Sequence, residues 1–159
     1  MKILDSGVRQ QFESGAVRDI SENKGRCDLL PLDIVGALLD IPEFALLELF
    51  KTTKNIQCLA KVIIEFNKTI NIDMCTCALE VSKHFENGAK KYGENNWKKG
   101  IPLHCFIDSA ARHRIKHKRG DTDEAHGRAY LWNLLCAMWT YTNKPELDDV
   151  DIDLIKHKK

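Results

Sequence analysis

Cationic, aromatic and amide side chains lie close together in the stretch between residues 84 and 139. Lys91 and Tyr92 come at the end of an expected helix, and Asn96 and Trp97 follow in a polar loop. Aromatic faces stack on nucleobases, at about 1–3 kcal/mol per base, and lysine neutralises phosphate as a point charge. These residues favour a nucleotide-like ligand. The alternative is that Tyr92 and Trp97 only cover the hydrophobic core, with their polar atoms at the surface.

Further along, Arg112 and His113 add an anion-binding and a titratable group. Asp108 precedes Arg112 by four residues, so the two are expected to pair along one helix face. The guanidinium fork of Arg112 matches phosphate or carboxylate bidentately. His113 and His117 are also four apart, a spacing that can bind metal, but no His-Glu-x-x-His arrangement surrounds them. His113 fits an interhelical hydrogen bond equally well.

Acids gather where the last long helix is expected to begin, with one histidine among them: Asp121, Asp123, Glu124 and His126. Acids at helix N-termini are ordinary capping residues. The alternative is a Mg²⁺ site built from oxygen ligands, to which another helix would contribute. The predicted metal ligands are Glu80, Glu86, Asp121 and Asp123.

The N-terminal region places glycines beside cations. Residues 15–19 and 24–26 contain Arg18, Lys24 and Arg26 next to Gly15 or Gly25. A loop of this kind can wrap phosphate with its backbone amides. The spacing does not match a Walker A motif.

The elements that must position these residues are predicted to be helices, because apolar residues recur every three or four positions along most of the chain. The expected helices run from Pro31 to Pro42, over residues 43–51 and 55–68, from Asp73 to Gly93, from Leu103 to Lys118, and from Asp121 or Thr122 to Asn143. A strand-like pattern is limited to a short piece near residues 8–12. We predict an all-α protein, a compact helical bundle with an irregular, glycine-containing segment at residues 1–28. One domain would span residues 1–147, followed by a charged, frayed tail at 148–159.

Composition narrows the class of protein. The chain has 159 residues, of which 43% are hydrophobic and 30% charged, which excludes disorder and a membrane protein. No secretory signal is apparent, so a cytoplasmic protein with six reduced cysteines is expected. Residues 83–119 carry ten Lys and Arg against three Asp and Glu, whereas both flanks are acidic. This uneven charge favours a confined anionic ligand over a long nucleic acid or a membrane.

Several segments together resemble a known family. They are residues 15–19, 24–31, 88–100 and 108–113, and Trp132-Asn133. These segments are similar to the "dATP/dGTP diphosphohydrolase, N-terminal" domain family of phage and prophage proteins. The resemblance implies a helical protein of phage nucleotide metabolism, located in the host cytoplasm and distantly related to MazG-type nucleotide pyrophosphohydrolases. Those enzymes hold Mg²⁺ with a Glu-x-x-Glu pair, and this chain has no Glu-x-x-Glu.

The first hypothesis is a nucleotide-binding protein without turnover. It would bind a purine nucleotide or a nucleotide second messenger and need no cofactor, and it would serve sequestration in an anti-defence role. The predicted binding residues are Arg18, Lys24, Arg26, Lys91, Tyr92, Asn96, Trp97, Arg112 and His113. Tyr92 or Trp97 would stack on the base, and Asn96 would read a base edge.

Two other hypotheses stay open. The second is a Mg²⁺-dependent dATP/dGTP diphosphohydrolase that releases a deoxynucleoside monophosphate and pyrophosphate. The third is a helical partner-binding protein whose basic middle meets an acidic surface. For both ligand-binding hypotheses we expect a homo-oligomer, since helical layers often complete a pocket across a two-fold axis.

Overall fold

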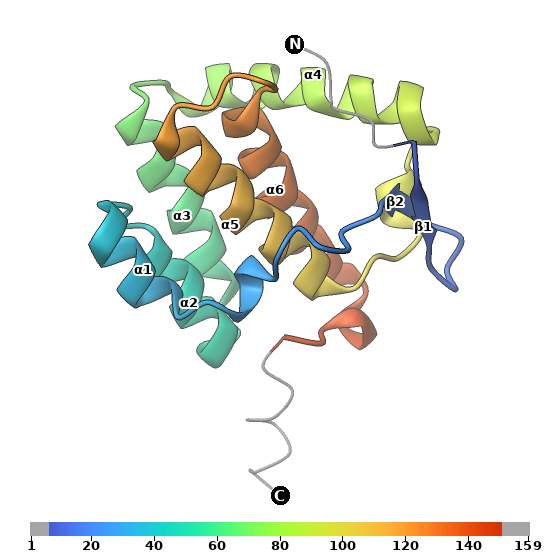
Figure 1. Ribbon diagram of the computed structural model, residues 1–159, viewed down its shortest axis with the longest axis horizontal. Helices are drawn as coiled ribbons and strands as arrows, with labels where there is room; N and C mark the ends of the chain where they lie inside the picture. Colours follow the sequence, from blue (N-terminus) through green and yellow to red (C-terminus); the bar gives the residue numbers. More distant parts are fainter. Residues whose placement is uncertain (1–6, 151–159) are drawn as a thin grey trace, which may run out of the picture.

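The described part of the chain, residues 7–150, folds into six α-helices and one β-hairpin (Figure 1). The coordinates are a computed structural model. The strands are β1 (Arg9–Gln11) and β2 (Val17–Asp19), and the helices are α1 (Leu32–Leu39), α2 (Phe44–Thr53), α3 (Ile56–Thr69), α4 (Met74–Tyr92), α5 (Leu103–Arg119) and α6 (His126–Asn143). Short 3₁₀ turns are η1 (Cys27–Leu29), η2 (Asn96–Lys98) and η3 (Pro145–Leu147). The predicted all-α fold class is confirmed.

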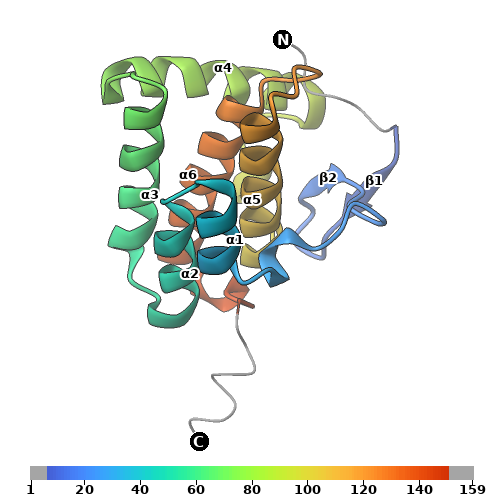
Figure 2. The same cartoon turned by 60° about the vertical axis from the view of Figure 1, so that its left-hand side comes forward.

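The helices pack in crossed layers. Figures 1 and 2 show α3, α5 and α6 side by side, with α4 lying across their ends and the hairpin on the far side from α1 and α2. Phe66, Phe106 and Tyr130 from the three central helices are completely buried. The Phe66 and Tyr130 rings meet edge to face, with centroids 4.9 Å apart. In residues 7–150, none of the helices is both long and apolar enough to cross a bilayer.

One ion pair is sealed inside this core. Arg114 of α5 is 2% exposed, and its Nε donates to Oε1 of Glu43, 2.5 Å away, at the start of α2. The Tyr130 hydroxyl donates to the same carboxylate over 3.4 Å. Burying an ion pair of this kind costs desolvation free energy, so its net contribution to stability depends on the additional hydrogen bonds that it receives. It fixes α2 against α5.

Helix ends agree with the sequence at some positions and differ at one. The Asp73 side chain accepts the Thr76 amide at the start of α4, and Gly120 ends α5 in the left-handed region, as predicted. The predicted cap of the last helix is wrong. Helix α6 begins at His126 without a side-chain cap, because the Asp121 carboxylate instead binds the Arg119 guanidinium, with oxygen–nitrogen distances of 2.7 and 2.5 Å.

The N-terminal segment is more ordered than predicted. Strand β1 falls in the short strand-like piece. Strand β2 was not predicted, and it pairs antiparallel with β1 in the register Arg9 to Asp19. Gly15 has φ +85° in the connecting turn, a conformation that suits glycine. The remainder of the predicted irregular segment includes η1, and residues 1–6 lie outside the described part.

The start of the predicted tail packs on the helices. Val150 is 4% exposed, and the Lys54 ammonium donates to Asp148 and to the Val150 carbonyl over 2.7 and 2.8 Å. These contacts explain why the folded part extends at least three residues past the predicted domain end. The rest of the predicted tail, residues 151–159, lies outside the described residues.

Candidate functional site

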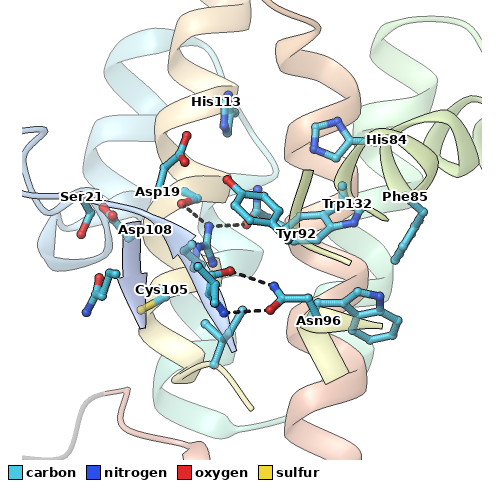
Figure 3. A pocket seen from close by; sticks show the side chains of 18 of the residues that line it. Asp19, Ser21, His84, Phe85, Tyr92, Asn96, Cys105, Asp108, His113 and Trp132 are labelled. Carbon is cyan, nitrogen blue, oxygen red and sulfur yellow. Dashed lines mark hydrogen bonds between the residues drawn. The ribbon is translucent and has the colours of Figure 1, made fainter. Parts of the chain in front are cut away.

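A cavity of about 770 Å³ opens between the hairpin, the C-terminal half of α4, the η2 loop, α5 and α6. Figure 3 shows its two sides. Asp19, Ser21 and Asp108 lie on one side, the His84 and Trp132 rings lie on the other, and Tyr92 lies between them. The cavity therefore has a polar wall, contributed largely by the hairpin and α5, and an aromatic wall, contributed by α4 and α6.

Eight of the nine predicted nucleotide-binding residues line this one cavity. They are Arg18, Lys24, Arg26, Tyr92, Asn96, Trp97, Arg112 and His113. They come from four separate segments that the fold brings together. The shared cavity gives these residues a common geometry, while their binding role stays a prediction.

Arg18 of β2 is held in a fixed position but lacks a counter-charge. Its NH2 group donates to the Ser109 hydroxyl over 2.9 Å and to Asn133 Oδ1 over 3.4 Å. The guanidinium also lies over the Phe106 ring, 5.2 Å from the centroid. Its other nitrogen, NH1, is buried without a hydrogen-bond partner, and within residues 7–150 Arg18 forms no ion pair. A cation placed this way favours an anion beside it.

The other cations of the cavity differ in how far they are already neutralised. Arg112 donates to both oxygens of Asp108 at 2.7 Å and to the Gly25 carbonyl at 2.6 Å, which confirms the predicted pairing along α5. Arg26 is bound bidentately by Asp28. Lys24 and Lys116 form no salt bridge within the described part of the chain. Uncompensated positive charge on the polar wall therefore comes mainly from Arg18, Lys24 and Lys116.

Lys91 is the one predicted binding residue that does not line the cavity. Its ammonium lies 2.8 Å from Oδ2 of Asp19, whose other oxygen is 2.7 Å from Arg9. Asp19 thus has two cationic partners, and Lys91 ties the end of α4 to the hairpin. We therefore assign Lys91 to holding the polar wall in place.

Asn96 is likewise engaged by the protein itself. It is 6% exposed, its Oδ1 accepts the Val17 amide at 2.8 Å, and its Nδ2 donates to the Val17 carbonyl at 2.8 Å. Figure 3 shows both bonds, which imitate the pairing of a neighbouring strand. Because both polar atoms of the amide are used, we replace the predicted base-reading role of Asn96 with that of docking β2 onto the η2 loop.

The aromatic wall is made by residues of two helices and the η2 loop. Trp97 packs edge to face against Phe85 and Trp139, with centroids 5.5 and 5.1 Å away. Much of its ring therefore belongs to the core, in line with the alternative left open for it. Tyr92 lies under the Arg9 guanidinium, 5.2 Å from its ring centroid.

Sequence reasoning missed two aromatic residues of this wall. Trp132 lines the cavity, and its buried Nε1 has no hydrogen-bond partner among residues 7–150. His84 lies next to it, with ring centroids 5.4 Å apart. Burial, followed by the charge of Arg128, lowers the pKa of His84 to about 4, so the ring is neutral near pH 7. Trp132 occurs in a continuous apolar pattern, and nothing in that pattern distinguishes a wall residue from a core residue.

A cluster of two histidines and acids lies at one edge of the cavity. Nδ1 of His113 is 2.9 Å from Nδ1 of His126, and Oε1 of Glu124 is 3.4 Å from the first and 3.7 Å from the second. Asp123 Oδ1 lies 2.6 Å from Nε2 of His126. Burial, followed by the charges of His126 and His84, lowers the pKa of His113 to about 3. The partner of His113 is thus His126, while His117 packs edge to face on Phe66.

The four predicted metal ligands do not meet as one group. Glu80 binds Lys83 and Arg128, and Glu86 lines the cavity but binds Lys90. Asp121 and Asp123 come together with His126, with potential ligand atoms within 4.8 Å of one another. In the described residues, two mixed groups that share His126 have ligand atoms close enough to hold a metal ion: His113, Glu124 and His126, and Asp121, Asp123 and His126.

A third titratable group sits at the start of α5. Nδ1 of His104 binds the Asp149 carboxylate, and its Nε2 is 3.5 Å from the Cys105 sulfur. The hydrogen bond to Asp149, followed by that to Cys105, raises the pKa of His104 to about 10. His104 and Cys105 both line the cavity.

Comparison with known proteins gives one result that bears on this site. A family model described as "dATP/dGTP diphosphohydrolase, N-terminal" matches residues 67–150. The matched part contains α4, the η2 loop, α5 and α6, and therefore the aromatic wall, Arg112 and the histidine cluster. No curated protein and no solved structure matched the chain.

Proposed function

The chain belongs to the dATP/dGTP diphosphohydrolase, N-terminal, family, and on that premise we propose that its cavity binds a purine nucleotide. The volume of about 770 Å³ suits a ligand of that size. The two walls match the two halves of a nucleotide, since cations recognise phosphate and rings stack on a base.

The uncompensated guanidinium of Arg18 carries this proposal. The bonds to Ser109 and Asn133 hold its fork without neutralising it, and its NH1 has no partner within the described residues. Leaving a charge half-buried and unpaired is costly. A phosphate group beside Arg18, also attracted by Lys24 and Lys116, removes that cost.

The base would lie against the aromatic wall. Tyr92 and Trp132 both line the cavity, and the buried Nε1 of Trp132 supplies an unused donor. An indole N–H is a donor only, so it suits an acceptor atom of a purine or a sugar. This arrangement replaces the predicted contact between Asn96 and a base edge.

We further propose that the nucleotide is retained without turnover, for sequestration of a purine nucleotide or a nucleotide second messenger. Phosphoanhydride cleavage needs metal ions and charge placed at the reacting phosphate. In the polar wall, the Asp19 and Asp108 carboxylates are already bound to cations, and the chain has no Glu-x-x-Glu. A phage origin, an anti-defence role and a homo-oligomeric state complete the proposal.

The test is calorimetric titration with dATP, dGTP and a cyclic purine nucleotide in EDTA, followed by heat denaturation and chromatography of the released ligand. We expect at least one of the three to bind and to be recovered intact. Arg18→Gln should weaken binding about 10- to 100-fold, since hydrogen bonds to charged groups contribute about 1.5–3 kcal/mol. Lys68→Gln is the control, because it removes the same charge from an exposed pair on α3. Equal affinity of the two variants would reject the cavity as the binding site.

A second candidate function is hydrolysis of dATP or dGTP to the monophosphate and pyrophosphate. The family description and the group formed by Asp121, Asp123 and His126 favour it. In this version Mg²⁺ is the cofactor, and Asp123→Asn should abolish turnover while binding persists. Recovery of monophosphate that ceases with EDTA supports hydrolysis, whereas intact recovery with Mg²⁺ present supports retention.

A further inference from the structure

The group of His113, Glu124 and His126 has the dimensions of a metal site. Its three nearest nitrogen and oxygen atoms form a triangle with sides of 2.9, 3.4 and 3.7 Å. The centre of the circle through three points with these separations lies about 2 Å from each of them, close to the usual Zn–N and Zn–O bond lengths. One ion beside the plane of the triangle therefore reaches all three atoms without rearrangement of the helices.

His126 is oriented as metal-binding histidines usually are. Its Nε2 lies 2.6 Å from the Asp123 carboxylate, and an ionised carboxylate only accepts hydrogen bonds. Nε2 of the neutral ring therefore carries the proton, and Nδ1 presents a lone pair toward His113 and Glu124. A carboxylate behind the imidazole is the common second layer of histidine–metal sites.

We propose that His113, His126 and Glu124 bind one divalent transition-metal ion of the Zn²⁺ class at the edge of the cavity. Imidazole nitrogen suits Zn²⁺, Cu²⁺, Fe²⁺ and Ni²⁺, whereas Mg²⁺ prefers an octahedral shell of oxygens. The donor set thus differs from the all-carboxylate Mg²⁺ site expected from the sequence. It uses two residues, His113 and Glu124, that line the cavity.

The neighbouring group of Asp121, Asp123 and His126 is the weaker competitor. Asp121 is held bidentately by Arg119, with contacts of 2.7 and 2.5 Å, and that cation opposes a metal ion. The two groups share His126, and binding through Nε2 would break its bond to Asp123. The group with His113 keeps that bond.

Three protein ligands leave at least one coordination position for another molecule. Because His113 and Glu124 face the cavity, a phosphate oxygen is a suitable occupant. That last step rests on the proposed nucleotide binding, but metal binding itself does not.

The experiment titrates Co²⁺, Zn²⁺ and Mg²⁺ alone into chelator-treated protein. Calorimetry gives the affinities, and the visible absorbance of Co²⁺ reports its coordination. We expect one Zn²⁺ or Co²⁺ per chain and at least 100-fold weaker Mg²⁺ binding. His113→Gln and Glu124→Gln should weaken Zn²⁺ binding at least 10-fold, and Asp123→Asn about 10- to 100-fold through His126. His117→Gln, on the same helix but packed on Phe66, is the matched control.

Circular dichroism and thermal unfolding of each metal-free variant separate loss of a ligand from loss of fold. If His113→Gln or Glu124→Gln is destabilised, His113→Asn or Glu124→Asp takes its place. Each replacement should weaken Zn²⁺ binding and change the Co²⁺ spectrum. The proposal is overturned if the parent binds no Zn²⁺, if Mg²⁺ binds as tightly, or if the His113 and Glu124 variants keep full affinity. Loss of binding in Asp121→Asn alone would assign the metal to the competing group. Nucleotide affinity measured in EDTA is independent of all these outcomes.

Discussion

At the residue scale, His104 and Asp149 form a pair whose contribution to stability depends on pH. Because the folded pKa of His104 is about 10, above its usual 6.5, the pair stabilises the fold fully below pH 6.5. That contribution declines as the pH rises from 6.5 and is lost above 10. On the acid side, burial raises the pKa of Asp149, but the hydrogen bonds from His104 outweigh it and lower the pKa overall. The contribution of Asp149 is therefore lost as the pH falls through that lowered value.

His104→Gln should therefore lower the free energy of unfolding by about 1 kcal/mol near pH 6, after allowance for solvent screening, and by much less above pH 10. Urea denaturation at several pH values measures this. Asp149→Asn should show the same dependence, and the double variant should add little. A loss from His104→Gln that is constant across this range would show that the ion pair is not its cause.

Arg114 and Glu43 predict a second, larger effect. Arg114→Leu leaves the Glu43 carboxylate buried with only the Tyr130 hydroxyl as a donor. The expected loss is about 3–5 kcal/mol in the free energy of unfolding. Adding Glu43→Gln should recover a large part of that loss, as denaturant unfolding of the three variants will show. An equal loss of stability in the single and double variants would show that lost packing, and not the unpaired charge of Glu43, causes the effect.

Most of the side chains that line the cavity were predictable, but their partners were not. The cations and rings stand out in the sequence, and eight of nine line one cavity. Lys91 and Asn96 looked equally suited to a ligand, yet Asp19 and Val17 engage them. Those partners are more than 70 residues away in sequence, and helical periodicity carries no information about such contacts.

At the element scale, the Asn96 amide docks strand β2 of the hairpin onto the η2 loop. Asn96→Ala removes both bonds to the Val17 backbone and leaves its partly buried amide and carbonyl without these partners. The cost should be about 1–3 kcal/mol, expressed as faster hydrogen exchange at the Val17 amide and weaker nucleotide binding. Asn143→Ala, which removes one exposed bond to Trp139, is the control. Unchanged exchange at Val17 would contradict the docking role.

The helices were predictable because each buries one apolar stripe, which leaves a repeating signal in the sequence. Only the first strand of the hairpin was predicted, because strands of three residues are too short to show an alternation of apolar and polar residues. The start of α6 was mispredicted for a different reason. Asp121 and Thr122 are good capping residues, but Arg119 draws Asp121 away from the helix.

At the scale of the whole molecule, two cysteines allow occupancy of the cavity to be followed. Cys105 lines the cavity, whereas Cys75 is exposed on α4 away from it. A saturating nucleotide should slow alkylation of Cys105 at least 10-fold and leave Cys75 unchanged, because only the first becomes covered. Peptide mass spectrometry after timed labelling gives both rates. Equal rates at Cys105 with and without ligand would place any binding elsewhere.

The residues that line the cavity come from two separate parts of the chain. Its rings and its histidines lie within residues 67–150, whereas Arg18, Lys24 and Arg26 precede that stretch. Two of the three uncompensated cations, Arg18 and Lys24, thus come from the N-terminal segment, whereas Lys116 and all the rings come from the helical part. If the proposed function holds, replacing residues 7–26 should change which anion the cavity prefers, while the aromatic wall keeps its own packing contacts. Such a chain is a natural starting point for modular sensors.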